Sequence, residues 1–385
     1  MFSFFTPQAI HFGRGQSQQV ASLAKGFGDN VLLVHGANAQ RAAWLVSQCR
    51  DAGLVTQAIG CENEPSLADI ERALVQFNGR RPDVVIALGG GSVIDFGKAL
   101  AALIPCRGKP LAYLEVVGDG RPLDAPPVPM IALPTTAGTG AEVTKNAVIS
   151  VPAHGLKVSL RDPRMIPQIA IVDPGLMQGA PKRVALTAGL DAITQVIEPY
   201  LSSKANPITD ALCHAAIATG LRVIRDLVEH DAPDAWDSMA WVSTCGGLAL
   251  ANAGLGAVHG FAGVIGGLTH APHGEICGVL LPSVLESHAR KAKSGTDIDT
   301  RLQWVLGQID SHFAQENKGD GLSGLRRWSK EMGLRDLETM GLTLAHQSQV
   351  AEAAQGASSM KGNPFSLTQQ ELRQILQSSM RILRP

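Results

Sequence analysis

The second half of the chain holds the side chains from which a catalytic divalent-metal site can be built. Asp191 is followed by Gln195, and a spacing of four places both side chains on one face of a helix, one turn apart. Three histidines follow on separate segments, His259, His270 and His273. One carboxylate with two or three imidazoles is a typical ligand set for zinc or iron. The spacing therefore predicts a metal site, to which the rest of the chain brings a nucleotide.

A glycine run earlier in the chain is typical of a phosphate-binding turn. Gly89–Ser92 directly follows a predicted buried strand at 83–88 and begins a predicted helix that reaches about residue 103. Glycines let the backbone approach a phosphate, and a helix N-terminus supplies N–H groups and a positive dipole. The run lacks the G-x-G-x-x-G spacing of the standard Rossmann turn. A tight turn without a ligand is the alternative interpretation.

A second loop has the composition of a nucleotide contact. Residues 134–142 follow a predicted strand at 128–133 and contain several threonines and glycines, which suit a phosphate or a ribose. A threonine-rich loop without a ligand is equally consistent with this composition. Lys157, in a strand-like stretch, is a candidate for a phosphate contact or a solvated lysine.

Periodicity predicts an α/β half followed by an all-helical half, with the boundary near residue 180. Continuous apolar runs, typical of buried parallel strands, alternate with helical patterns in the first half and predict a parallel sheet with helices on both faces. The predicted strands are residues 31–35, 83–88, 128–133 and a last strand from 169 that stops at Pro174. A capping box of Ser66 and Asp69 predicts the start of another helix in this half. The later predicted helices are residues 207–229, capped by Asn206, and residues 235–251, 300–315, 321–333 and 367–383, with an exposed loop at 290–298.

Length and composition indicate a two-domain protein without a nucleic-acid or membrane partner. The chain has 385 residues, 45% of them hydrophobic, a net charge of -1 and no visible basic patch. The six cysteines are scattered, which favours free thiols in a reducing compartment. The N-terminus is a poor signal peptide, and every apolar run is shorter than a membrane span. These features predict a soluble cytoplasmic protein.

These blocks together resemble the iron-containing (group III) alcohol dehydrogenase family over essentially the whole chain. The matching blocks are Gly89–Ser92 with Asp95, Pro134–Glu142, Asp173–Pro174, Gly189–Ala192 and Gly256–Gly274. The resemblance implies a dehydroquinate synthase-like architecture. In it, residues 1–180 form an α/β dinucleotide-binding domain and residues 181–385 form an all-helical metal and substrate domain. A metal in the cleft between the domains, and a homodimer or larger homo-oligomer, are also implied.

The resemblance implies that the metal ligands are Asp191, Gln195, His259 and His273. The family usually has histidine in place of Gln195, and an amide oxygen is a weaker ligand than imidazole. It also often has a proton-relay histidine where this chain has Gly263. Asp191, His259 and His273 alone match the three-ligand zinc site of glycerol dehydrogenase relatives. Alternatively the site has decayed, with Gln195 forming hydrogen bonds instead. His270 is a possible substitute proton donor or ligand, or a surface histidine.

The resemblance also assigns a set of cofactor-binding residues. They are Gly36, Asn38, Gly89, Gly90, Gly91, Ser92, Asp95, Thr135, Thr136, Thr139, Thr144, Lys157 and Leu176. NAD-preferring members carry an acidic residue after the second strand, where it binds the ribose 2′-hydroxyl. Here that segment reads His35-Gly36-Ala37-Asn38, without a carboxylate, and Arg41 is close by in sequence. We therefore expect NADP(H) to be favoured over NAD(H), together with Fe²⁺ or Zn²⁺.

The predicted activity is hydride transfer between NAD(P)H and an aldehyde or primary alcohol, with the metal acting on the substrate oxygen. Three alternatives remain open from the sequence. The first is a glycerol dehydrogenase-like polyol dehydrogenase with zinc and NAD. The second is a lyase of the 3-dehydroquinate synthase type, although the residues around Asp191 and His259 offer few basic groups for its substrate. The third is a nucleotide-binding relative without catalysis, suggested by Gln195 and Gly263.

Overall fold

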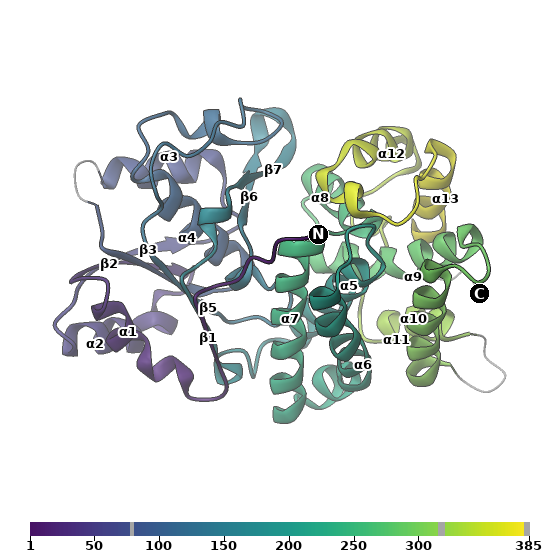
Figure 1. Cartoon of the computed structure of the whole chain (residues 1–385), viewed down its shortest axis with the longest axis horizontal. Coiled ribbons are helices and arrows are strands. Elements are labelled where there is room, and N and C mark those ends of the chain that lie inside the picture. The colour runs from purple at the N-terminus through teal and green to yellow at the C-terminus, as the bar shows by residue number, and fades with distance from the viewer. Residues whose placement is uncertain (78–80, 315–319, 381–385) are drawn as a thin grey trace. The chain divides into compact units, whose positions relative to one another are not determined.

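The computed structural model describes residues 1–77, 81–314 and 320–380. These residues form two compact units, each described by itself below (Figure 1). One unit consists of Phe5–Thr136 and Gly140–Gln178. The other consists of Met1–Phe4, Ala137–Thr139 and the chain from Gly179 onward. The assignment of dinucleotide binding to residues 1–180 and of metal binding to residues 181–385 stays a prediction.

The first unit is built on a six-stranded parallel sheet. Its strands, in the order β1-β8-β5-β4-β2-β3, are β1 (Ala9–Phe12), β8 (Ile169–Val172), β5 (Met130–Pro134), β4 (Val84–Gly89), β2 (Asn30–Gly36) and β3 (Val55–Cys61). The central strands are apolar and buried along most of their length, because a parallel strand covered on both faces has no solvent side. The predicted parallel α/β sheet is confirmed.

Helices cover both faces of this sheet. They are α1 (Val20–Lys25), α2 (Ala43–Asp51), α3 (Leu67–Gln76) and α4 (Gly91–Leu103). Alternate residues of β2 point to opposite faces. Leu32 and Val34 belong to the core beneath α3 and α4, whereas Val31 and Leu33 belong to the core beneath α1 and α2. The capping box that the sequence predicts at Ser66 begins α3.

A small antiparallel hairpin accompanies the main sheet, and only its second strand, the strand-like stretch around Lys157, was predicted. It pairs β6 (Asn146–Val151) with β7 (Leu156–Arg161). Both strands are short, and buried and partly exposed residues alternate in them. The apolar and polar residues of Leu156–Arg161 alternate, which is the pattern of a half-buried strand.

The second unit is all-helical, as predicted. Its helices are α5 (Lys182–Leu201), α6 (Pro207–His230), α7 (Pro233–Ala253), α8 (Ala257–Thr269), α9 (His273–Lys291), α10 (Asp297–Phe313), α11 (Gly321–Glu331), α12 (Gln347–Gly356) and α13 (Gln369–Met380). Asn206 caps α6 and Pro207 is its first residue, which confirms the predicted start. Residue 315 of the predicted helix 300–315, and residues 381–383 of the last predicted helix, lie outside the described residues.

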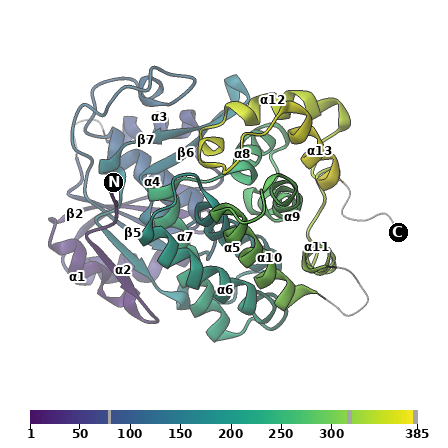
Figure 2. The ribbon, with the colours of Figure 1, turned by 45° about the vertical axis from the view of Figure 1, so that its right-hand side comes forward.

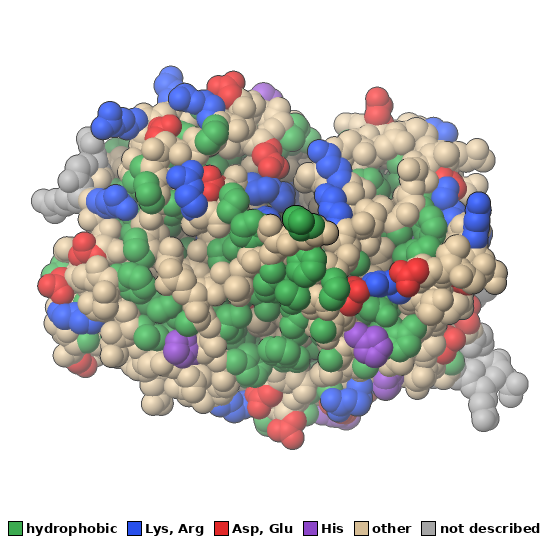
Figure 3. Space-filling view, in the orientation of Figure 1, with side chains coloured by type: hydrophobic (Ala, Val, Ile, Leu, Met, Phe, Trp, Pro, Cys, Tyr) green, Lys and Arg blue, Asp and Glu red, His purple; other side chains and the backbone are tan. Residues whose placement is uncertain are grey.

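The surface charge and the hydrophobicity of the helices bear on the prediction that the protein binds neither nucleic acid nor a membrane. On the face drawn in Figure 3, charged side chains of both signs are interspersed. Within residues 1–77, 81–314 and 320–380, no single helix is long and apolar enough to cross a membrane. Helices α7 and α8 reach the length and hydrophobicity of a membrane span only when they are counted together, and they meet at a 99° bend.

Candidate metal centre and cofactor edge

Helix α5 is the central helix of the second unit and carries the first predicted ligand. Its residues from Gly189 to Leu201 are all buried, because α6, α7 and α9 all pack against it (Figure 2). Asp191, Gln195 and Glu198 follow one another at spacings of four and three, so they share one face of the helix. That face directs a carboxylate, an amide and a second carboxylate into the helical core.

Glu198 fixes the N-terminus of α8 and the orientation of His259. One carboxylate oxygen, Oε1, accepts a hydrogen bond from the backbone N–H of Val258 at 2.7 Å. The other, Oε2, lies 2.6 Å from Nδ1 of His259. An acidic group at a helix N-terminus is favoured by the exposed N–H groups and the helix dipole. With the proton on Nδ1 donated to Glu198, Nε2 of His259 faces Asp191.

Helix α9 brings the third predicted ligand to the same place. His273 is its first residue, and Cys277 follows one turn later on the same face. The close approach of α9 to α5 requires a glycine at position 274. A Cβ atom there would lie 2.3 Å from the backbone oxygen of Thr187 and 3.3 Å from Cβ of Asp191.

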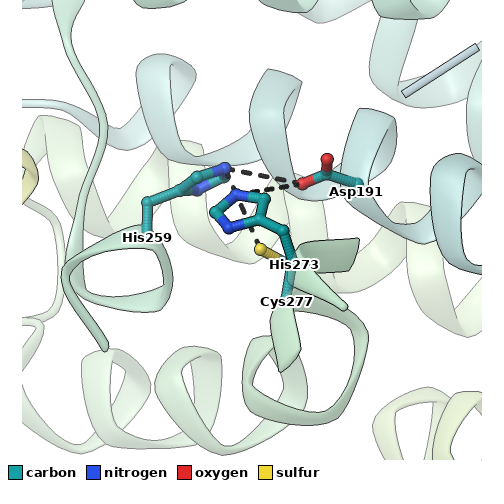
Figure 4. Close-up of side chains that lie close together, drawn as sticks. All are labelled: Asp191, His259, His273 and Cys277. Carbon is teal, nitrogen blue, oxygen red and sulfur yellow. Dashed lines mark hydrogen bonds and ion pairs between the residues drawn. The ribbon is translucent and has the colours of Figure 1, made fainter. Parts of the chain in front are cut away.

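Asp191, His259 and His273 meet in space, together with Cys277 (Figure 4). Oδ1 of Asp191 lies 3.5 Å from Nε2 of His259 and 3.9 Å from Nε2 of His273. Sγ of Cys277 lies 3.9 Å from Nε2 of His259. One ligand atom from each of the four residues lies within 4.8 Å of the other three.

The chemistry of this cluster fits a cation. Asp191 is buried, yet its Oδ1 atom accepts no hydrogen bond from any described residue, which is costly for a carboxylate. With Nδ1 of His259 engaged by Glu198, Nε2 faces this oxygen across 3.5 Å, so its lone pair must hold either a proton or a metal ion. Two facing acceptors repel each other unless a proton or a metal ion lies between them. The residues present therefore fit a divalent ion, and the carboxylate behind His259 is the outer-shell partner that metal-binding histidines commonly have.

Protonation equilibria in the cluster are strongly perturbed. Burial alone would raise the pKa of Asp191, but the neighbouring His273 and His259 outweigh it and lower that pKa. Burial alone would lower the pKa of His259, but the neighbouring carboxylates of Glu198 and Asp191 outweigh it and raise that pKa well above its usual value. Burial raises the pKa of the Cys277 thiol to about 12. Without a metal the cysteine is thus a neutral thiol at physiological pH.

The two other predicted residues of this site lie in different surroundings. Gln195 is buried one turn after Asp191, and its amide nitrogen donates to the backbone oxygen of Thr139 at 2.6 Å. It thereby holds the segment 137–139 against α5. His270 is exposed at the C-terminus of α8, with a φ of 56°, and is not one of the four clustered residues. Metal binding by Gln195 and a catalytic role for His270 stay predictions.

Replacing Gly274 with alanine is expected to separate α9 from α5. The new Cβ meets the Thr187 backbone, which cannot rotate away, so the protein should lose about 1–3 kcal/mol of unfolding free energy and much of its metal affinity. Gly307→Ala in α10 is the matched control, since no atom lies within 4 Å of its added Cβ. That variant should keep its stability or gain up to about 1 kcal/mol. Equal stability of the two variants in urea unfolding would contradict this account of the packing.

The candidate cofactor residues of the first unit gather at one edge of the sheet. β2 and β4 are paired, so their carboxyl ends, Gly36 and Gly89, lie at the same edge. From β2 the chain continues to β3 on one side, and it later places β4 and β5 on the other side. The strand order thus reverses between β2 and β4, and ligands of open α/β sheets bind in the crevice at such a point.

The glycine run at this edge leaves the start of α4 accessible to a ligand. A Cβ atom at Gly89 would lie 2.5 Å from Cβ of Val93, so only glycine fits where the strand turns into the helix. Gly90 is the N-cap of α4 and supplies no side-chain hydrogen bond to its first N–H groups. Gly91 and Ser92 begin the helix, and the N–H of Thr135 donates to the Gly89 oxygen at 3.0 Å. Thr136 follows at the same edge.

The remaining candidates mostly have protein partners. Oδ2 of Asp95 accepts a hydrogen bond from the backbone N–H of Val148 at 3.0 Å. Oδ1 of Asp95 lies 3.4 Å from Nζ of the buried Lys98, and the same Nζ atom donates to Oγ1 of Thr144 at 2.7 Å. Lys157 on β7 forms an ion pair with Glu64. Asn38 caps the short helix η2 (Ala39–Ala42), and Leu176 packs against the core beneath α1 and α2. Contact of these residues with a nucleotide stays a prediction.

Comparison with known proteins places the chain in a family. Residues 7–174 match the family described as iron-containing alcohol dehydrogenase, and residues 185–380 match the C-terminal part of the Fe-containing alcohol dehydrogenase family. The chain belongs to the iron-containing alcohol dehydrogenase family. The resemblance inferred from the sequence motifs is therefore confirmed.

Relatives and solved structures agree over the full length. Alcohol dehydrogenase 4 of Saccharomyces cerevisiae is 28% identical over 389 residues, which cover 98% of each chain. The NAD-dependent methanol dehydrogenase of Bacillus methanolicus is 28% identical over 391 residues, 99% of this chain and 100% of that one. The structure of an alcohol dehydrogenase from Oenococcus oeni has a TM-score of 0.85 and 28% identity, covering 98% of this chain and all of that chain.

This member of the iron-containing alcohol dehydrogenase family is an oxidoreductase that acts on alcohols. The family implies a divalent metal and NAD(H), and the cluster around Asp191 is a candidate metal site.

Two residues of this dehydrogenase site were missed in the sequence. Glu198 lies seven residues after Asp191, a spacing that returns to the same helix face, and this could have indicated it. Cys277 lies four residues after His273, the same one-turn spacing as Asp191 and Gln195. Lys98 was also missed in the other unit, where a lysine within the apolar run of α4 signals a buried charge with partners.

Proposed function

We propose that this alcohol dehydrogenase is metal-dependent and transfers hydride between NAD(P)H and an aldehyde or primary alcohol. Asp191, His259 and His273 hold a divalent ion, and the carboxyl edge of β2, β4 and β5 holds the dinucleotide. The observation that supports the metal most directly is the buried Oδ1 atom of Asp191, which accepts no hydrogen bond from the described residues and faces both histidines. Homodimers or larger homo-oligomers and a cytoplasmic location are part of the same proposal.

The residues of the chain have separate tasks in this reaction. A bound divalent ion supplies Lewis acidity toward the substrate oxygen. Asp191 contributes the negative charge that retains such an ion, and Glu198 keeps the Nδ1 proton of His259 in place so that Nε2 stays available as a donor. Burial of Asp191 and His259 excludes water, which strengthens their electrostatic interactions.

The glycine run is assigned to the phosphates of the dinucleotide. The bound dinucleotide supplies the hydride chemistry. Gly89 and Gly90 let the backbone approach a phosphate, and the N–H groups at the start of α4 are oriented to donate to it. Thr135 and Thr136 at the end of β5 offer hydroxyls at the same edge of the sheet.

Steady-state reduction of short aldehydes and ketones tests this proposal. The protein is stripped of metal and reloaded with iron(II), with zinc or with nothing, and each form is assayed with NADH and with NADPH. Turnover that appears only after reloading supports the proposal. Full turnover by metal-free protein, or binding of nucleotide without any turnover, would overturn it. Faster turnover of glycerol than of simple aldehydes would favour a polyol dehydrogenase.

The residue at position 36 is expected to control the choice of nucleotide. We propose NADP(H) as the favoured cofactor because no carboxylate stands at the end of β2 to repel a 2′-phosphate. Gly36→Asp should shift the ratio of kcat/KM for NADPH over NADH toward NADH by about tenfold or more, since like charges brought together cost several kcal/mol. The side chain has room, because the nearest atom to an added Cβ is Cγ2 of Val93 at 3.9 Å.

Gly36→Asn is the control for this change, with nearly the same volume and no charge. It should leave the ratio close to that of the unaltered enzyme. If both variants shift the ratio equally, shape rather than charge selects the nucleotide, and the argument for NADP(H) fails.

A further inference from the structure

The predicted fourth metal ligand, Gln195, already has a protein partner in the structure. The motifs point to Gln195 as the fourth ligand. In the structure, however, the Gln195 amide nitrogen donates to the Thr139 backbone oxygen at 2.6 Å. The side chain thus has a structural partner of its own. An amide oxygen is, moreover, a weak ligand for zinc or iron(II).

A sulfur atom lies at the cluster instead. Cys277 is fully buried in α9, one turn after His273, and its Sγ atom lies 3.9 Å from Nε2 of His259 (Figure 4). That atom and one donor atom each from Asp191, His259 and His273 lie mutually within 4.8 Å. Four donors bound to one zinc ion at about 2.0–2.3 Å lie at comparable separations from one another, so only small side-chain movements are needed.

The independent sign that a ligand belongs here is the Asp191 carboxylate. Its Oδ1 atom is buried, accepts no hydrogen bond within the described part of the chain, and is directed toward the same point as the sulfur (Figure 4). Cys277 has no counterpart among the other cysteines in this respect. Cys49, Cys61, Cys213 and Cys245 are also buried, but none belongs to the four-residue cluster.

We infer that Cys277 is a direct ligand of the metal ion, which makes the donor set one carboxylate, two imidazoles and one thiolate. On binding, the thiol loses its proton to the solvent and the sulfur lone pair forms the bond to the ion. Thiolate and imidazole donors favour zinc over iron(II) at such a site. A zinc site can expand to five ligands during catalysis, so four protein donors do not prevent it from acting on a substrate. This inference rests on the proposed metal-dependent function.

X-ray absorption at the zinc edge of the zinc-loaded enzyme tests the inference directly. We expect one sulfur neighbour at about 2.3 Å in the unaltered protein, in addition to nitrogen and oxygen neighbours. Cobalt(II) in place of zinc should give a thiolate-to-cobalt charge-transfer absorption in the near ultraviolet. Both signals should disappear in Cys277→Ser and remain in Cys245→Ser, a control in which a buried thiol outside the cluster is changed. The zinc Kd of Cys277→Ser should rise at least about tenfold.

The possible outcomes separate this inference from the proposed function. Stoichiometric zinc with only nitrogen and oxygen neighbours would overturn the role of Cys277 and leave metal-dependent catalysis standing. Failure of the unaltered enzyme to bind zinc, cobalt or iron(II) would overturn both. If Cys277→Ser does not fold, the spectra of the unaltered enzyme decide the question by themselves, because sulfur either is or is not a neighbour of the ion.

Discussion

Asp191→Asn is expected to lower the affinity for zinc or iron(II) by more than about 100-fold and to remove turnover in parallel. Loss of an outer-shell partner of a metal site costs about 10–100-fold, and a charged direct ligand should cost more. Asparagine keeps the size of the side chain, so the substitution leaves no cavity on the buried face of α5. The dissociation constant is measured by competition with a chelator of known affinity.

The stability of the metal-free forms shows whether this variant remains folded. The substitution also removes the attraction to His259 and His273 that lowers the pKa of the carboxyl group, so the metal-free variant should melt below the metal-free parent but still unfold in one cooperative transition. The parent should be stabilised by added zinc, through preferential binding to the folded state, and the variant should not. A variant that binds zinc as tightly as its parent would show that Asp191 is not a ligand.

Glu198→Gln is expected to weaken metal binding about 10–100-fold without touching a direct ligand. If the amide oxygen continues to accept from the Val258 N–H, the amide nitrogen must face Nδ1 of His259 and donate to it. The proton of the imidazole then resides on Nε2, which can no longer offer its lone pair to an ion. Glu198 is therefore a positioning residue, and isothermal titration with zinc measures its effect.

Glu286→Gln serves as the control for this prediction. Glu286 is also a carboxylate on a helix of the second unit, where it pairs with Arg326 outside the metal cluster. It should leave zinc affinity unchanged. If Glu198 had a purely structural role, Glu198→Gln would lower the melting temperature of the metal-free protein. The fraction that remains folded would keep its zinc affinity, which is the reverse of our expectation.

The sequence predicted the architecture well where local signals were strong. The buried strands β2, β4 and β5, the helix start at Ser66 and the cap at Asn206 all follow from apolar runs and capping residues, which act within a few residues. Of the β6–β7 hairpin, only the strand-like stretch around Lys157 was predicted, and β6 and its pairing with β7 were missed.

The site was only partly predictable, because its chemistry depends on contacts between distant segments. Asp191, His259 and His273 could be proposed from residue type and motif, and the structure brings them together. A hydrogen bond from Gln195 was one of the alternatives, but its partner Thr139 could not be foreseen, since the two residues lie on separate segments. The same holds for Glu198 beneath His259 and for Cys277 beside it.

The pairing of β1 with β8 affects how the chain can fold during synthesis. Ala9 pairs with Ile169, so β1 has no neighbour in the sheet until the long segment between these two residues has been synthesised. Contacts so distant in sequence form slowly. Until β1 docks, one side of β8 exposes backbone N–H and C=O groups to which a strand of another chain can bind. β1, whose four residues include none of the candidate site residues, is therefore expected to cover this side of β8 late in folding and to become the edge strand of the finished sheet.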